Sequence, residues 1–214
     1  MIKIFKNEPT SGDYRIGVGV PCHVQDLELL SNYSLPSIFG LDPCPDVIAV
    51  NINRGEGGLK KIRADLYETL FHDYDCDVLF NMSADMIVFS DALKYVHRNH
   101  IVSYGPIFKT PISTIITLFF RLSTALRGEK SWRGTYSLPR EVWYDKVLGT
   151  GLWDGTDSSI RIAVNSEFES VPFPKVMIVR KNYLKLKQVT LYHPLNQDMN
   201  PLRKILKLTQ ALPF

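Results

Sequence analysis

Cysteine is scarce in this sequence and cannot be fully paired. The 214 residues contain three cysteines, Cys22, Cys44 and Cys76, each within or beside an apolar run. An odd number of thiols in apolar surroundings argues against a disulfide framework and indicates reduced, intracellular cysteines. Cys22 and Cys44, with His23 and His72, lack the paired spacing that zinc ligands show. We therefore expect a cytoplasmic protein without disulfides.

Long apolar runs are also lacking. The longest one, residues 111–126, contains Arg121 and several Ser and Thr, and it falls short of the ~20 apolar residues that a membrane-spanning helix needs. Residues 1–13 are short and mixed in charge, unlike a signal peptide. We expect no integral membrane protein, although residues 111–126 are apolar over most of a helical circumference. Such a segment suits a buried helix or an element on a membrane surface.

A strong excess of one charge is missing from the whole chain but not from its end. The net charge is +3, yet residues 175–214 hold eight Lys and Arg against Asp198 alone, which gives +7 there and −4 over residues 1–174. A basic end suits an anionic lipid surface or a phosphate, or is a solvated basic segment. Because these basic residues lack interleaved aromatics on a recognisable motif, we expect no nucleic-acid binding.

What is present is a regular alternation of strand and helix signals in a chain of ordinary soluble composition. Apolar residues make up 45% and charged residues 22%, and the length suits one domain. We predict strands over residues 14–21 and 46–53, a helix over 26–33, a turn-rich connection over 35–45 and a second helix over 59–70. An apolar run from Asp77 follows. This β-α-β-α-β order implies right-handed crossovers and a parallel sheet, hence an α/β fold.

One carboxylate follows the third of these strands at once. The run from Asp77 ends in the small-residue turn Ser83-Ala84-Asp85. Open α/β sheets bind their ligands at the carboxyl edge, so we expect Asp85 to face a metal and a nucleotide there. The preceding helix has a glycine-rich loop before it and one apolar face, formed by Leu59, Ile62, Leu66 and Leu70.

This succession resembles the nucleotide-sugar domain of inverting family 2 glycosyltransferases, which have the GT-A fold. Ile62-Arg63-Ala64 stands in the place of their "ARN"-like element, and Ser83-Ala84-Asp85 in the place of their DxD metal motif, with Ser83 replacing the first carboxylate. The resemblance implies a single GT-A-like three-layer α/β domain with a mainly parallel central sheet over residues 1–199. A basic amphipathic helix or tail over residues 200–214 follows it.

The resemblance also implies a donor site for a nucleotide sugar and for Mn²⁺ or Mg²⁺. Asn51 and Asn53 stand where the family usually has an aspartate-rich turn that contacts the nucleobase and ribose. His193 follows a late predicted strand, where a histidine often completes the metal shell together with the carboxylate of the DxD motif. The residues expected to bind donor or metal are Pro21, Asn51, Asn53, Arg63, Ser83, Asp85 and His193.

The same resemblance also implies residues for binding the acceptor and for the catalytic general base. Gly134 and Thr135 match the family's acceptor loop in character, and Trp153 either stacks on a sugar or fills the core. Asp157 matches the second acid of an acidic pair, the general base, while Thr156 replaces the first. Asp154 is the nearby alternative base, and the alternative role of Asp157 is a helix cap. The acceptor that the resemblance implies is a sugar or a lipid-linked molecule.

Two other functions stay open on the sequence alone. A nucleotidyltransferase shares this type of sheet, but the residues after Pro21 lack the glycine-rich signature that it usually needs. A non-catalytic nucleotide-sugar-binding domain is favoured by Ser83, Thr156 and the two asparagines, which replace acids. Peripheral contact with the inner face of the membrane is expected through residues 111–126, residues 200–208, or both.

Overall fold

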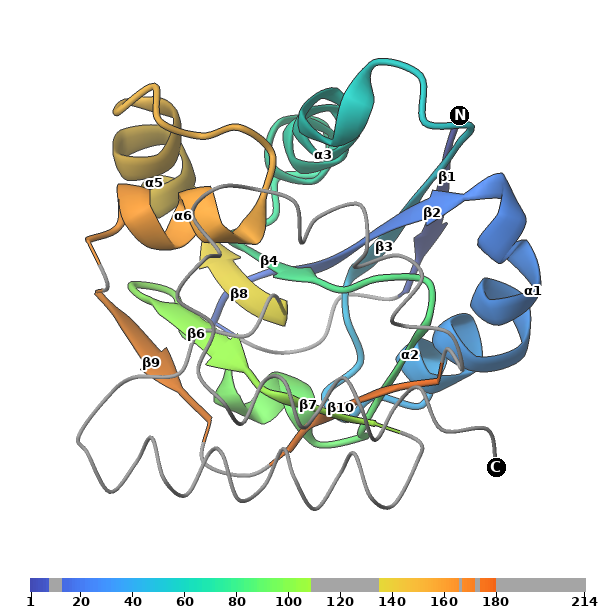
Figure 1. Cartoon of the computed structure of the whole chain (residues 1–214). Coiled ribbons are helices and arrows are strands. Elements are labelled where there is room, and N and C mark those ends of the chain that lie inside the picture. The colour runs from blue at the N-terminus through green and yellow to red at the C-terminus, as the bar shows by residue number, and fades with distance from the viewer. Residues whose placement is uncertain (8–12, 109–134, 166, 172–173, 180–214) are drawn as a thin grey trace, which may run out of the picture.

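A seven-stranded sheet forms the centre of the computed structural model (Figure 1), which describes residues 1–7, 13–108, 135–165, 167–171 and 174–179. The strand order is β1-β3-β2-β4-β8-β6-β9. Their bounds are β1 Ile2–Lys6, β2 Ile16–His23, β3 Val47–Asn53, β4 Val78–Asn81, β6 Ile101–Tyr104, β8 Thr135–Pro139 and β9 Phe168–Ser170.

Most of these strands run in one direction. β2 pairs in parallel with β3 and β4, and β6 in parallel with β9. β8 is antiparallel to both β4 and β6, so β6 and β9 share the direction of β4. β1 is antiparallel to β3. The carboxyl ends of β3, β2 and β4 therefore meet at one edge of the sheet, as the predicted β-α-β-α-β order requires.

Two apolar cores lie on the two faces of this sheet, because successive strand residues point to opposite sides. Ile48, Val50, Val78 and Phe80 belong to one cluster, whereas Leu79 and its neighbours in the other strands belong to the second. Helices cover the first face through η1 Val24–Asp26, α1 Leu27–Leu29, η2 Leu30–Ser34 and α2 Leu35–Phe39, and the second through α3 Gly58–Glu68, η3 Thr69–Asp73, α5 Arg140–Val142, η5 Trp143–Leu148 and α6 Asp157–Ala163.

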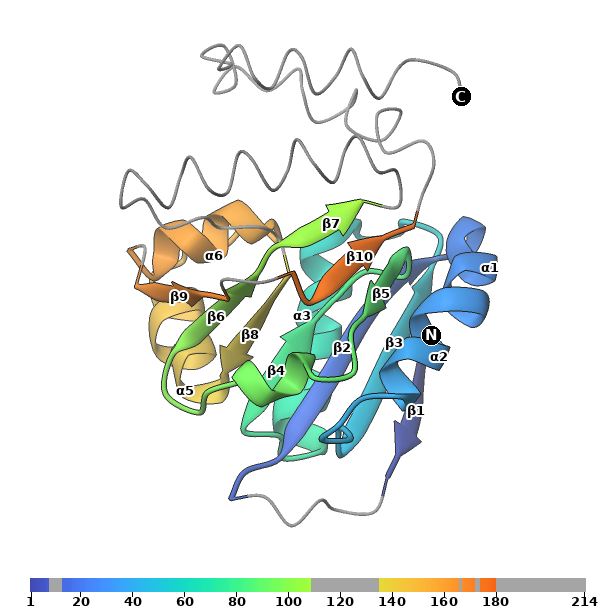
Figure 2. The same ribbon diagram turned by 90° about the horizontal axis from the view of Figure 1, so that it is seen from below.

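A small second sheet lies beside the carboxyl edge of the large one (Figure 2). Its order is β5-β10-β7, with β5 Met86–Val88, β7 Pro106–Phe108 and β10 Val176–Ile178. β10 is antiparallel to β5 and parallel to β7. The 3-10 turn η4 Ala92–Tyr95 connects β5 toward β6.

The glycines of β2 bring α3 close to the sheet. A Cβ atom at Gly19 would lie 2.8 Å from Cδ1 of Leu79 and 3.2 Å from Cδ2 of Leu66. Leu66 belongs to α3 and is fully buried. The absence of a side chain at Gly19 therefore sets the distance between helix and sheet.

Several predicted boundaries were wrong. The strand predicted over 14–21 continues to His23 through its pairing with β3. Pro21 is tolerated there because the pairing of β2 with β4 ends at Gly19, so its missing N–H costs no hydrogen bond to β4. The turn predicted over 35–45 is helical as far as Phe39, with Pro36 in the first turn, where its missing N–H is tolerated. After β5 the chain forms only the 3-10 turn η4, and Val96 is extended.

β8 and β1 come from segments that were not expected to form strands. Residues 134–140, predicted as an acceptor-side loop, contain β8, whose five residues are all buried between β4 and β6. β1 precedes the predicted first strand and pairs with β3 as an edge strand. The segments 111–126, 184–192 and 200–208 lie outside the described residues. None of the helices in the described ranges combines the length and the hydropathy that a membrane-spanning segment requires.

Candidate active site at the carboxyl edge of the sheet

The turn after β4 holds the predicted metal ligand. Met86 N donates to the carbonyl oxygen of Ser83 at 3.1 Å, which closes a turn over Ser83-Ala84-Asp85. Val179 N, at the end of β10, donates to the carbonyl oxygen of Asp85 at 2.9 Å. The backbone of Asp85 is thus fixed from two sides, while the residue itself is only partly buried. The structure places this carboxylate at the edge where a ligand was expected.

Thr135 reaches the same turn from the neighbouring antiparallel strand. β8 begins at Thr135, and its register sets Tyr136 opposite Asn81 at the end of β4. The Thr135 hydroxyl donates to Sδ of Met86 at 3.3 Å and is fully buried. Thr135 therefore supports the residue that follows Asp85, and its neighbour Gly134 lies outside the described residues, as does His193.

A cleft of about 640 Å³ opens beside the end of β3 and the start of α3. Asn51 and Asn53, the two residues of β3 that were predicted to contact the nucleobase and ribose, both line it. The loop between β3 and α3 turns at Gly57, which directly precedes the first residue of α3. Its φ of +80° is a conformation that glycine adopts without strain. The remaining residues that line the cleft include Met1, Val24, Arg54, Glu56, Lys61, Ile62 and Asp65.

The two asparagines also organise the backbone around this cleft. The Asn51 side-chain amide donates to the carbonyl oxygen of Ile62 at 3.0 Å and holds α3 against β3. The Asn53 amide donates to the carbonyl oxygens of Cys22 and Asn51, each at 3.1 Å, and its oxygen accepts from Gly55 N at 3.0 Å. Asn53 therefore ties the ends of β2 and β3 to the glycine-rich loop. Pro21 lies in register with Asn51 and is half-buried.

An ion pair joins Arg63, one of the residues expected to bind the donor, to the predicted base Asp157. Arg63 Nη1 lies 2.7 Å from Asp157 Oδ1 and donates to the carbonyl oxygen of Gly155 at 2.8 Å. The Arg63 side chain is 7% exposed and the Asp157 side chain 30%. Gly155 has φ of +93°, and a Cβ there would lie 2.4 Å from Cα of Lys60. This close approach of the loop to α3 positions Asp157 beside Arg63.

The two candidate bases differ in their surroundings. Burial raises the pKa of the Asp157 carboxyl group, and the Arg63 guanidinium opposes that rise. Hydrogen bonds from Thr156 lower the pKa of Asp154, whose Oδ1 accepts from the Thr156 hydroxyl at 2.7 Å and from Thr156 N at 2.8 Å. Asp154 is exposed. A base with a raised pKa accepts a proton more readily near neutral pH, so Asp157 is the better suited of the two.

The helix cap is Thr156 and not Asp157. The Thr156 hydroxyl accepts from Ser159 N at 3.2 Å, and Thr156 has the extended backbone of an N-cap residue. Asp157 is the first residue of α6. The alternative interpretation of Asp157 as the cap is therefore wrong, although its charge still lies at the favourable end of the helix dipole.

Trp153 fills the core. It is 3% exposed, its ring lies 4.7 Å from the Trp143 ring at 85°, and it stacks on Tyr67 at 6.2 Å. Of the two predicted roles, stacking on a sugar needs an open ring face, and the burial of Trp153 leaves none. Trp153 therefore does not offer a ring face on which an acceptor sugar could stack.

A buried polar network that was not expected from the sequence lies next to the ion pair. Tyr67 lies one helical turn after Arg63, and its hydroxyl donates to Oδ1 of Asn81 at 3.0 Å and contacts the Tyr136 hydroxyl at 2.5 Å. Burial raises the pKa of Tyr67 to about 12, so it stays a hydrogen-bond donor at neutral pH. The i, i+4 spacing of Arg63 and Tyr67 was the available signal. The network ends at Asn81, the last residue of β4, four residues before Asp85, and its two tyrosines interact electrostatically with Arg63.

Comparison with known proteins identifies the fold. The sequence matches no family model and no curated protein. The solved structure of TarS residues 1–349 from S. aureus is similar, with a TM-score of 0.52 and 10% identity over 89% of this chain and 68% of that chain. The glycosyltransferase GlyE of Streptococcus pneumoniae TIGR4 has a TM-score of 0.45 and 10% identity over 94% of this chain and 61% of its own. The TarS likeness confirms the predicted GT-A-like α/β fold.

Proposed function

We propose that this chain is a glycosyltransferase that moves a sugar from a nucleotide-sugar donor to a sugar or lipid-linked acceptor with inversion. The observation that carries the proposal is the placement of Asp85, the cleft with Asn51 and Asn53, and Asp157 around the carboxyl edge of one sheet. This is where open α/β sheets bind nucleotides. The fold shared with TarS supports the same assignment.

The residues at this edge suit a divalent cation that is shared with the donor. Among the described residues, Asp85 belongs to no group of three or more metal ligands. Mg²⁺ and related ions are commonly held by one or two carboxylates, with phosphate oxygens and water as the other ligands. Such an ion, when bound, neutralises charge on the departing diphosphate. Asp85 supplies the protein carboxylate in this proposal, and His193 is proposed as a second ligand from the sequence alone.

The chain's own residues perform the remaining tasks in this proposal. The cleft beside the glycine-rich loop holds the nucleoside, and Asn51 and Asn53 line it. Arg63 fixes Asp157 through Oδ1, which is buried, while 30% of the Asp157 side chain remains exposed. The accessible part of that carboxylate takes the proton from the attacking acceptor hydroxyl. Residues 111–126 and 200–208 are proposed to contact the inner face of a membrane.

Calorimetric titration with UDP, GDP, CDP and dTDP sugars, each with and without Mn²⁺, tests the proposal. We expect one nucleotide-sugar class to bind, with an affinity that depends on Mn²⁺, because the diphosphate and Asp85 share the ion. Binding of nucleoside triphosphates in preference to every nucleotide sugar would instead indicate a nucleotidyltransferase. No binding of either kind contradicts the proposal.

A second candidate function, a non-catalytic nucleotide-sugar-binding domain, is favoured by the ion pair of Asp157 with Arg63. A carboxylate that serves only to anchor α6 needs no access to an acceptor. Measured turnover of Asp157→Asn and Asp154→Asn distinguishes a glycosyltransferase from a non-catalytic binding domain.

Asp157→Asn is expected to lower kcat by about 100-fold or more while donor affinity stays unchanged, because proton removal matters in the transition state and not in the ground state. In the unmodified enzyme, kcat should fall as the pH drops through the raised pKa of Asp157, because a protonated carboxyl group cannot act as a base. Asp154→Asn is the matched control three residues earlier, and we expect near-normal turnover. Full turnover in Asp157→Asn, or loss only in Asp154→Asn, contradicts the assignment of the base.

A further inference from the structure

Two histidines and a glutamate gather at the edge of the sheet opposite the candidate active site. One ligand atom from each of His97, His100 and Glu169 can be chosen so that all three lie within 4.8 Å of one another. His100 Nε2 lies 3.2 Å from Glu169 Oε1, and the His97 and His100 rings stack at 4.2 Å with 26° between their planes. Within the described residues this is the only such group of three or more.

The fold brings these residues together through the register of β6 and β9. His100 directly precedes β6, and Ile101 pairs with Phe168 while Val102 pairs with Glu169. Ile101 and Phe168 both face the core on the helix side. Because side chains alternate along a strand, His100 and Glu169 share the opposite face. The loop before His100 then returns His97 to stack on it.

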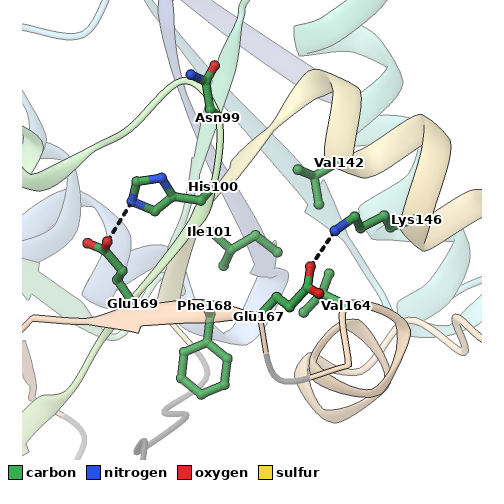
Figure 3. A pocket seen from close by; sticks show the side chains of 9 residues that line it. All are labelled: Asn99, His100, Ile101, Val142, Lys146, Val164, Glu167, Phe168 and Glu169. Atoms are coloured by element: carbon green, nitrogen blue, oxygen red, sulfur yellow. Dashed lines mark hydrogen bonds and ion pairs between the residues drawn. The ribbon is translucent and has the colours of Figure 1, made fainter.

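Two nearby basic side chains in the described part of the chain, Lys146 and Arg98, are paired with other carboxylates. A pocket of about 260 Å³ lies beside His100 and Glu169 (Figure 3). Lys146, across this pocket, is already paired with Glu167 at 2.5 Å. Figure 3 shows the two ion pairs on opposite sides of the pocket. Arg98, between the two histidines in sequence, pairs with Asp77 instead.

The buried nitrogen of His100 also points to a ligand. His100 Nε2 is shielded from solvent and makes no hydrogen bond, and its contact with Glu169 is an ion pair only if the ring is protonated. When the neutral ring carries its proton on Nδ1, His100 Nε2 and the facing Glu169 oxygen are both acceptors, and the two atoms repel unless a metal ion lies between them. A metal ion satisfies both ligands and the neighbouring His97.

We propose that His97, His100 and Glu169 bind Zn²⁺. Imidazole nitrogens with one carboxylate suit Zn²⁺, whereas Mg²⁺ takes oxygen ligands. Zn²⁺ holds nitrogen and oxygen ligands at about 2.0–2.2 Å, so modest side-chain rotations bring the three atoms into contact with the ion. Three protein ligands leave one tetrahedral position for water or for a small ligand from the pocket. The bound ion fastens the loop before β6 to the edge strand β9.

The test uses the full chain carrying Asp85→Asn, so that the candidate active-site metal does not contribute. Zn²⁺ affinity is measured by competition with a chromophoric chelator, and Co²⁺ is added as a spectroscopic probe. We expect one Zn²⁺ per chain, a rise in Tm with Zn²⁺, and the visible absorption of Co²⁺ bound by nitrogen ligands. His100→Ala and Glu169→Gln should each weaken binding by roughly tenfold or more, since each removes one ligand.

His72→Ala is the matched control, because His72 is an exposed histidine 3.3 Å from the carboxylate of Asp73 and resembles His100 with Glu169 except for the third ligand. It should leave Zn²⁺ affinity unchanged. His97→Ala keeps the His100–Glu169 pair but removes the third ligand, so Zn²⁺ affinity should fall in this variant as well. Equal Zn²⁺ affinity of the parent and the His100→Ala chain, or loss in His72→Ala alone, overturns the proposal.

Discussion

Asp85→Asn is expected to abolish Mn²⁺-dependent binding of the nucleotide sugar, with a loss in affinity of more than about 100-fold, as removal of a direct ligand exceeds the effect of its supporting partners. The asparagine keeps the shape of the side chain but lacks the charge that attracts a hard cation. The turn itself should persist, because it is held by backbone hydrogen bonds from Met86 N and Val179 N.

The measurement is calorimetric titration of the preferred nucleotide sugar with and without Mn²⁺, accompanied by urea unfolding. We expect the free energy of unfolding to change by less than about 1 kcal/mol, since the substitution leaves the core untouched. Asp73→Asn is the matched control: Asp73 is exposed and follows α3 on the amino side of β4. An Asp85→Asn protein that keeps its Mn²⁺-dependent affinity would show that the donor is bound without this carboxylate.

Arg63→Met should cause the largest loss of stability. It removes the guanidinium from a pair in which Arg63 is 7% exposed, and it also removes the hydrogen bond to Gly155. Removing one partner of a buried ion pair costs about 3 kcal/mol or more, and the 30% exposure of the Asp157 side chain places the expected loss at the lower end of that range. Urea unfolding at pH 7 measures the effect. Arg98→Met is the control, because Arg98 pairs with Asp77 but is 58% exposed, and such surface pairs contribute about 0–1 kcal/mol.

The pH dependence of this loss identifies its cause. Burial already raises the pKa of Asp157 while Arg63 opposes the rise, so removal of Arg63 should raise that pKa further. A group with a folded-state pKa above its unfolded value stabilises the protein below that pKa, and this stabilisation disappears as the pH rises through it. The cost of Arg63→Met should therefore shrink as the pH falls below the raised pKa of Asp157.

Asp157→Asn in the Arg63→Met background is expected to recover part of the lost stability, because no charge then remains buried without a partner. A cost of Arg63→Met no greater than that of Arg98→Met, or a cost independent of pH, would show that the pair contributes little to the fold.

The sequence determined the parallel half of the fold and the site edge. Continuous apolar runs before Asn51 and Asp85 predicted buried parallel strands, and the 3.6-residue spacing of Ile62, Leu66 and Leu70 predicted α3. These signals are local, because a strand buried on both faces is a continuous apolar run and a helix buried on one face shows apolar residues at 3.6-residue spacing. The position of Asp85 followed from them, since a residue after a parallel strand must lie at the carboxyl edge.

Tertiary structure alone decided which distant polar residues meet. β8 was missed because its five residues are central only through pairing with β4 and β6, and no local pattern marks an antiparallel insertion. The Arg63–Asp157 pair, the Tyr67–Tyr136 contact and the His100–Glu169 pair each join residues far apart in the chain. Their partners are selected by strand order and register, which depend on the packing of the whole sheet and not on the spacing of residues along the sequence.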